Sequence, residues 1–372
     1  MPSTNTNLIR VKYSLRLGSI MGINLFVHWT FFILIGWVIF SHLSLQTNPI
    51  QIVWTVIFLL AVFACITLHE FGHALTAKYF NIKTHSIVLL PIGGLAQLES
   101  IPEKPKEELL IAIAGPMVNF ILAGLLFLVL TVTSSATVSD LDIISSASFL
   151  PSLIQVNFLL ALFNLIPSFP MDGGRVFRAL LSFRIGHLKA TRVAASTGQL
   201  IAIGFILYGI VYNPFLIFIG VLIFAGAKSE ANFSEIKSLL KNFKVHDAMI
   251  QTIPFVENDI TIKEAANKLL SDENKTFIVT DHGMPTGSLS REEIYEALRE
   301  QNENTPVENV KNKELLYVSP EMPLDEALGK IMKEKKEIAL VGADGALQGY
   351  LDKENIDEFL QIQKALTNKN NN

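Results

Sequence analysis

Long apolar runs dominate the first 230 residues of the chain. Four stretches, at 17–68, 109–139, 143–171 and 193–227, contain no Asp, Glu, Lys or Arg. A helix needs about 20 apolar residues to cross a bilayer. We therefore predict six membrane-spanning helices, at about 24–44, 52–78, 107–132, 150–171, 195–212 and 214–230. The chain from about 228 onward is charged and is typical of soluble protein.

Basic residues lie on one side of this array. The loops at 45–51, 133–149 and 212–214 contain no Lys or Arg. All basic residues up to 230 fall in the other set of segments: Arg10, Lys12, Arg16, Lys78, Lys83, Lys104, Lys106, Arg175, Arg178, Arg184, Lys189, Arg192 and Lys228. Because Lys and Arg are retained in cytoplasmic loops, we predict a multi-pass protein of the cell membrane with both termini in the cytoplasm. The first apolar run is too long for a cleavable signal peptide.

Composition agrees with a protein in a lipid bilayer. Half of the residues are hydrophobic and 17% are charged, whereas about a quarter are charged in typical soluble domains. The only cysteine, Cys65, lies within the second predicted span. A disulfide framework is therefore excluded, and we interpret Cys65 as a packing residue.

An HEFGH motif lies within the second predicted span. On a helix, His69 and His73 are one turn apart on the same face and can bind one zinc ion, while Glu70 can act on a zinc-bound water. Histidines on an apolar helix are more often packing residues. Here, however, Glu70 interrupts a segment without charge, and an ionisable residue in such a segment is a functional candidate.

A catalytic zinc site needs a third protein ligand. The best candidate is Asp172, in the segment 164–175 with the sequence NLIPSFPMDGGR. This segment ends the fourth predicted span, at the same depth as the histidines. Pro167 and Pro170 break the helix there, and non-helical backbone at membrane depth lines a cavity or is buried in protein. A simple Asp-Gly-Gly turn is the alternative for this segment taken alone.

The first 230 residues resemble the site-2 protease family of intramembrane zinc metalloproteases. HEFGH matches the HExxH of that family, and Asn164-x-x-Pro167-x-x-Pro170-x-Asp172-Gly173 matches its second motif. The resemblance implies one zinc ion per chain bound by His69, His73 and Asp172, Glu70 as general base, and Asn164 as a stabiliser of the oxyanion. The segments 91–96 and 114–119 also resemble the family and are interpreted as framework and substrate-strand features.

The expected substrate is a membrane protein with a single span. A helix hides its carbonyl groups in hydrogen bonds, so the substrate must unwind before cleavage. We expect the segment 87–98 to bind the unwound strand along its edge.

The soluble part contains an internal repeat. The order helix, strand, strand, helix occurs twice, in 245–300 and in 305–363. This resembles a tandem pair of cystathionine-beta-synthase-type (CBS) domains. We thus divide the chain into a membrane metalloprotease domain at 1–230, a linker at 231–244, the tandem CBS domains at 245–363 and a disordered tail at 364–372.

The CBS resemblance implies two alternatives for the repeat. It binds an adenosine nucleotide, with Ser290, Glu293 and Asp352 as the candidate residues, or it is a structural module that forms a homodimer. The family pattern Gly-x-x-Ser/Thr-x-x-Asp is incomplete in both copies. Either way, a regulatory role for the pair is expected.

Two function classes follow. In the first, the chain is expected to be a polytopic α-helical intramembrane zinc metalloprotease, with its zinc site on the cytoplasmic side and a C-terminal α/β CBS pair that regulates it. Alternatively, it is a membrane channel or transporter with CBS regulatory domains, in which the same ionisable residues line an ion path. A hydrolytic glutamate between two metal ligands favours the protease. No nucleic-acid partner is expected.

Overall fold

The computed structural model describes residues 14–91, 93–98, 102, 104–133, 148–271, 275–300, 302–334, 336–343 and 346–370. The chain divides into two compact units, Met1–Asn232 and Phe233–Asn372. We refer to them as the membrane unit and the repeat unit. The division lies two residues after the expected end of the membrane domain at 230.

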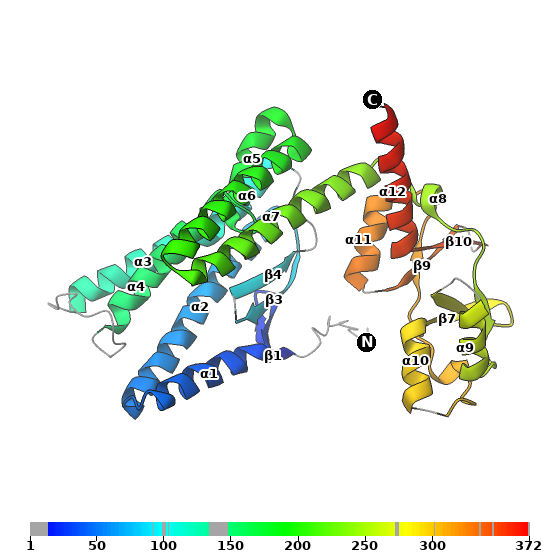
Figure 1. The fold of residues 1–372 in the computed structure, drawn as a ribbon, viewed down its shortest axis with the longest axis horizontal. Coiled ribbons are helices and arrows are strands. Elements are labelled where there is room, and N and C mark those ends of the chain that lie inside the picture. The colour runs from blue at the N-terminus through cyan, green and yellow to red at the C-terminus, as the bar shows by residue number, and fades with distance from the viewer. Residues whose placement is uncertain are drawn as a thin grey trace. The chain divides into compact units, whose positions relative to one another are not determined.

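The membrane unit is mainly helical (Figure 1). Its helices are α1 (Thr30–Ser44), α2 (Pro49–Tyr79), α3 (Pro105–Thr133), α4 (Phe149–Asn164), α5 (Asp172–Ile185), α6 (His187–Val211) and α7 (Pro214–Leu240). Within the described residues, α2, α3, α6 and α7 are long and apolar enough to cross a membrane, while α1 and α4 are shorter apolar helices. The start of α2 is set by Pro49 and by the side chain of Asn48, which accepts a hydrogen bond from the Ile50 amide at 3.0 Å.

Two predicted spans are longer than the observed helices. The first, expected at 24–44, begins with a strand, and its helix starts only at Thr30. The fourth, expected at 150–171, ends at Asn164. Pro167 and Pro170 follow in a loop, because proline removes a helical hydrogen bond and clashes with the preceding turn.

A four-stranded sheet lies beside α2 in the membrane unit (Figure 1). It has the order β1 (Ser14–Ile20), β2 (Ile23–His28), β3 (Thr84–Leu90), β4 (Gly93–Leu98). Strands β2 and β3 are parallel, and the other two pairs are antiparallel. Ile23 and Val27 of β2 pack with Ile87 of β3 and with Phe71 and Ala74 of α2. The core thus fixes the sheet on the helix with the HEFGH motif and leaves β4 at one edge of the sheet.

Small residues allow the helices of the membrane unit to approach closely. Helix α3 packs against α2, α4 and α5, and α5 packs against α6. A Cβ atom built on Gly72 of α2 would lie only 2.9 Å from the Ala114 carbonyl oxygen of α3. Glycine at a helix contact in a membrane protein permits this backbone approach. The end of α2 and the start of α3 are therefore held together.

The repeat unit contains two copies of one arrangement. The first comprises α8 (Val245–Ala248), β5 (Phe255–Glu257), α9 (Ile262–Ser271), β6 (Thr276–Asp281), β7 (Met284–Ser290) and α10 (Arg291–Glu300). The second comprises the 3-10 helix η1 (Val307–Asn309), β8 (Leu316–Val318), α11 (Leu324–Glu334), β9 (Ile338–Ala343), β10 (Ala346–Asp352) and α12 (Lys353–Asn370). Each copy has one parallel and one antiparallel strand pair. The predicted order of helices and strands is present, but the three-residue strands β5 and β8 were not anticipated.

The ends of the repeat unit also differ from expectation. Most of the range 231–244, predicted to be a linker, belongs to α7, which continues to Leu240. Of the tail predicted to be disordered, residues 364–370 belong to α12, and 371–372 lie outside the described residues. Ile356 and Leu360 anchor α12 in the core of the second copy. Once a helix is anchored, each further residue adds a hydrogen bond without a new nucleation cost, so α12 extends beyond its packed part.

Candidate metal centre

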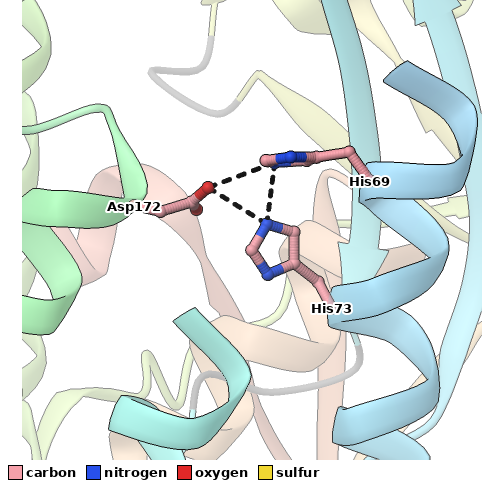
Figure 2. Close-up of side chains that lie close together, drawn as sticks. All are labelled: His69, His73 and Asp172. Atoms are coloured by element: carbon pink, nitrogen blue, oxygen red, sulfur yellow. Dashed lines mark hydrogen bonds and ion pairs between the residues drawn. The ribbon is translucent and has the colours of Figure 1, made fainter. Parts of the chain in front are cut away.

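Helix α2 presents His69 and His73 on one face (Figure 2). Both side chains are buried, each with 6% of its surface exposed. Their Nε2 atoms lie 3.1 Å apart, and the rings are nearly perpendicular, at 80°. The spacing of four residues on a helix therefore brings two imidazole nitrogens to one point.

Asp172, the first residue of α5, faces the two histidines (Figure 2). Its Oδ2 atom lies 3.2 Å from Nε2 of His69 and 3.1 Å from Nε2 of His73. The loop from 165 to 171 sets this position, since a Cβ atom on Gly173 would overlap the backbone of Leu165 and Ile166. Glycine at 173 lets the start of α5 pack directly against the end of α4.

The donor atoms fit a zinc ion. Two ligands at about 2.0–2.1 Å from zinc, at a tetrahedral angle, are separated by roughly 3.3 Å. The three donor atoms are 3.1–3.2 Å apart, and they supply the nitrogen and oxygen chemistry that zinc binds. A Cβ atom on Gly115 of α3 would lie only 2.7 Å from Nε2 of His69, and nearer still to Nε2 of His73. The absence of a side chain there keeps the centre open.

One imidazole is fixed in the form that can bind a metal. Nδ1 of His73 lies 2.7 Å from the carbonyl oxygen of Ile111 in α3. A carbonyl oxygen only accepts, so Nδ1 carries the proton and the lone pair of Nε2 points to the centre. Nδ1 of His69 is buried and has no hydrogen-bond partner among the described residues.

Glu70 lies between the metal centre and the edge of the sheet. Its carboxylate accepts a hydrogen bond from the backbone N–H of Ala96 in β4. Ala96 pairs with Ile87 of β3, and β4 is an edge strand of the sheet. A Cβ atom on Gly94 would lie 2.5 Å from Cγ of Glu70. The absence of a side chain at Gly94 thus leaves room for the Glu70 carboxylate beside β4.

Asn164 is the last residue of α4 and is partly buried. Among the described residues, it makes no hydrogen bond with His69, His73 or Asp172. The loop 165–171 connects it to Asp172, and the backbone of Leu165 lies against Gly173. Asn164 therefore lies close to the start of α5, but its amide makes no hydrogen bond to the three donor residues.

The candidate nucleotide residues cap helices of the repeat unit. Ser290 and Glu293 form a reciprocal pair at the start of α10: the Ser290 amide donates to Glu293 at 2.8 Å, and the Glu293 amide donates to the Ser290 hydroxyl at 3.3 Å. Asp352 and Asn355 exchange equivalent bonds at the start of α12. Burial raises the pKa of Asp352 above its usual value. These residues lie at corresponding positions of the two copies, with helix capping as their observed role.

The sequence pattern did not predict a buried ion cluster around Arg178, a residue that indicated topology alone. Arg178 of α5 is 1% exposed and binds Glu108 of α3 and Glu230 of α7. The partners are 70 and 52 residues away along the chain, so local spacing could not reveal them. One signal was present: both glutamates lie beside uncharged stretches, just before 109–139 and just after 193–227.

Comparison with known proteins divides the chain in two parts. The model of peptidase family M50 matches residues 57–209, and the CBS domain model matches 245–300 and 307–361. Zinc metalloprotease MJ0392 of Methanocaldococcus jannaschii is 34% identical over 353 residues, which cover 95% of this chain and 97% of the relative. The solved site-2 protease of the same organism is 40% identical and covers 59% of this chain and 95% of its own, with a TM-score of 0.44. The solved CBS domain pair of protein MJ0100, in complex with 5-methylthioadenosine and S-adenosyl-L-methionine, is 20% identical and covers 32% of this chain and 98% of its own, with a TM-score of 0.30.

Proposed function

Because the chain belongs to peptidase family M50, we propose that it cleaves membrane-spanning segments of other proteins at the centre formed by His69, His73 and Asp172. The chain is a zinc metalloendopeptidase of the site-2 protease type with a C-terminal CBS pair. The convergence of three donor atoms from α2 and α5 within 3.2 Å of one another carries the proposal. The channel or transporter alternative is not favoured.

His69, His73 and Asp172 hold one zinc ion, and Glu70 is the general base. When bound, zinc polarises the scissile carbonyl and activates a water as nucleophile. The Glu70 carboxylate takes a proton from the attacking water as the oxygen–carbon bond forms. Glu70 then delivers this proton to the leaving nitrogen as the peptide bond breaks. The position of Glu70 next to the histidines, outside the donor set, supports this role.

Asn164 donates a hydrogen bond to the oxyanion that develops on the scissile carbonyl. Its place at the end of α4, where the backbone of the next residue, Leu165, lies against Gly173, supports this role. An amide without a bond to the metal ligands is available to a substrate.

The substrate strand pairs with the outer edge of β4. The Ala96 N–H of this edge strand donates to Glu70, so a strand bound along β4 lies next to the base. The test is disulfide cross-linking between Leu95→Cys, in a Cys65→Ser background, and single cysteines along a substrate. Leu95 is 52% exposed. Cross-links should recur at every second substrate residue, while Leu110→Cys, on α3 and 44% exposed, should give none. Cross-links without this period would refute strand pairing.

The proposed topology has six passes, α1, α2, α3, α4, α6 and α7, with both termini and the metal centre on the cytoplasmic side. Two observations support it. The end of α2 and the start of α3 meet at the His73–Ile111 bond, and α4 returns to the same level, where Asp172 follows. The basic segments of the sequence all fall on this side.

The CBS pair regulates cleavage. An adenosine nucleotide between the copies is one mechanism, with Ser290, Glu293 and Asp352 as contacts, and homodimer formation is another. Titration of the purified protein with an adenosine nucleotide, monitored by its melting temperature, separates the two. A concentration-dependent rise supports nucleotide binding, whereas an unchanged melting temperature together with a dimeric mass supports a structural pair.

The central experiment compares wild type and Glu70→Gln after purification in detergent. Zinc per chain is measured first, followed by cleavage of a panel of single-span membrane proteins. We expect about one zinc per chain in both proteins and cleavage by the wild type alone, since Gln cannot accept the proton. Glu107→Gln is a matched control: Glu107 lies on α3 and binds Lys104 at 2.9 Å, away from the donor atoms, and this variant should cleave normally. Absence of zinc from the wild type, or cleavage by Glu70→Gln, would refute the mechanism.

A further inference from the structure

Arg178 connects three segments of the membrane unit through buried contacts. Its Nε donates to Oε1 of Glu108 at 2.7 Å, and its Nη2 lies 2.6 Å from the same oxygen. Nη1 donates to Oε1 of Glu230 at 2.5 Å. The guanidinium also lies over the ring of Phe169, 4.9 Å from its centroid. Arg178, Glu108 and Phe169 are 1–2% exposed.

These contacts connect the segment that holds a histidine ligand with the segments that hold the aspartate ligand. Glu108 is one helical turn before Ile111, whose carbonyl oxygen accepts the hydrogen bond from His73. Phe169 lies in the loop that leads to Asp172, and Arg178 itself lies in the helix that Asp172 begins. One turn of α3 thus holds a histidine ligand of α2 directly, and holds the helix of the aspartate ligand through Arg178.

The chemistry of the guanidinium suits this task. Buried charges are costly unless they are paired and hydrogen-bonded, so α5 cannot slide or rotate against α3 and α7 without exposing or separating Arg178 from its carboxylates. The planar fork of arginine fixes direction as well as distance, which the point charge of lysine does not.

We propose that Arg178 is a positioning residue for Asp172: through Glu108 and Glu230 it sets where α5 stands relative to α2, and hence the separation of the three donor atoms. This inference rests on the proposed function, since it assumes that the centre binds zinc. Glu230 lies in α7 two residues before the division between the units. A shift of α7 would therefore reach Asp172 through Arg178.

The test measures metal binding by the full-length protein in detergent. Zinc affinity is determined by competition with a chelator for wild type, Arg178→Lys and Glu230→Gln, and the visible spectrum of the cobalt-substituted proteins reports ligand geometry. Groups that orient metal ligands typically affect metal affinity about 10–100-fold. We expect a loss in this range with an altered cobalt spectrum for Arg178→Lys, and a smaller loss for Glu230→Gln, because Arg178 keeps Glu108. Arg184→Lys, an exposed position on the same helix, should match the wild type.

A triple variant, Arg178→Met with Glu108→Gln and Glu230→Gln, separates positioning from charge balance. It removes the charges of Arg178, Glu108 and Glu230 together, so neither carboxylate is left without its arginine. If Arg178 positions Asp172, zinc affinity stays low in this variant. The inference is overturned if the triple variant recovers wild-type affinity, or if Arg178→Lys lowers the melting temperature but leaves zinc affinity and the cobalt spectrum unchanged. A wild type that binds no zinc would instead refute the proposed function itself.

Discussion

Gly115 gives the sharpest test of the metal centre. In Gly115→Ala, the new Cβ atom would lie 2.7 Å from Nε2 of His69 and closer to Nε2 of His73. An ordinary contact needs roughly 3.5 Å, so the His69 ring must retreat by about 0.8 Å, and the His73 ring by more. Zinc sites tolerate ligand displacements of only about 0.2 Å. The variant should therefore lose at least one ligand.

The size of this effect follows from the energy of zinc binding. Structural zinc sites bind with about 10–16 kcal/mol. Shared evenly among four ligands, this is about 2.5–4 kcal/mol for each, which corresponds to roughly a 60- to 700-fold loss of affinity at 1.4 kcal/mol per factor of ten. The same substitution improves helix propensity by about 1 kcal/mol, so a loss of zinc is not expected to reflect an unfolded α3.

Chelator competition on the purified protein measures this loss. Gly124→Ala is the matched control: Gly124 lies on the same helix, and a Cβ atom there meets nothing within 4 Å. This control should retain zinc and melt at the same temperature as the wild type or slightly higher. If Gly115→Ala binds zinc within threefold of wild type, the histidine rings do not lie as described and the donor arrangement is wrong.

Three other substitutions test separate parts of the structure. Gly94→Ala places a Cβ atom 2.5 Å from Cγ of Glu70, so cleavage should fall at least about tenfold while zinc stays bound, as measured by metal content and substrate cleavage. In Gly220→Leu, the new side chain meets the Ala202 carbonyl oxygen at 2.8 Å and should separate α6 from α7, lowering the melting temperature by several degrees. Asp352→Asn keeps the cap of α12 and removes a buried charge. Burial raises the pKa of Asp352 in the folded state. The protonated carboxyl therefore makes its full contribution to the stability of the wild type below the usual pKa of 3.8, and this contribution is lost as the pH rises through the raised pKa. The variant should therefore melt higher at pH 7, with the difference vanishing as the pH approaches 3.8.

Each of these predictions has a clear contrary result. Loss of zinc together with activity in Gly94→Ala would mean that the substitution disturbs the metal ligands and not only Glu70. Gly204→Leu is the control for the helix pair, since a Cβ atom on Gly204 of α6 meets nothing within 4 Å; equal melting temperatures for the two leucine variants would contradict close packing at Gly220. A lower melting temperature for Asp352→Asn at pH 7 would show that the charge stabilises the fold.

The sequence was sufficient to propose the donor set because each residue carried a local signal. His69 and His73 have helical spacing, and Asp172 follows two prolines at the end of an apolar run. In the structure, the donor atoms of these three residues lie close together. The repeat could likewise be predicted, because each copy has its own apolar pattern of strands and helices.

Features that depend on distant partners could not be predicted in this way. Residues 23–28 are mostly apolar and carry no Asp, Glu, Lys or Arg, a pattern that a buried strand and the start of a membrane helix share. In the structure they form a strand that pairs with β1 and with β3, which lies some 60 residues later. Arg178 is an ordinary basic residue in the sequence. Its burial depends on carboxylates supplied by two other helices.

The lengths of α1 and α4 have a consequence for the surrounding lipid. With 15 and 16 residues, these helices extend about 22 and 24 Å, less than the roughly 30 Å of the hydrocarbon layer. On the proposed six-pass topology, lipid next to them must thin to avoid exposing apolar tails. A substrate helix of ordinary length entering this thinned annulus would be too long for it, so hydrophobic mismatch would strain the helix before it reaches β4. Bilayer thickness would then tune cleavage, and reconstitution in lipids of increasing chain length measures that dependence.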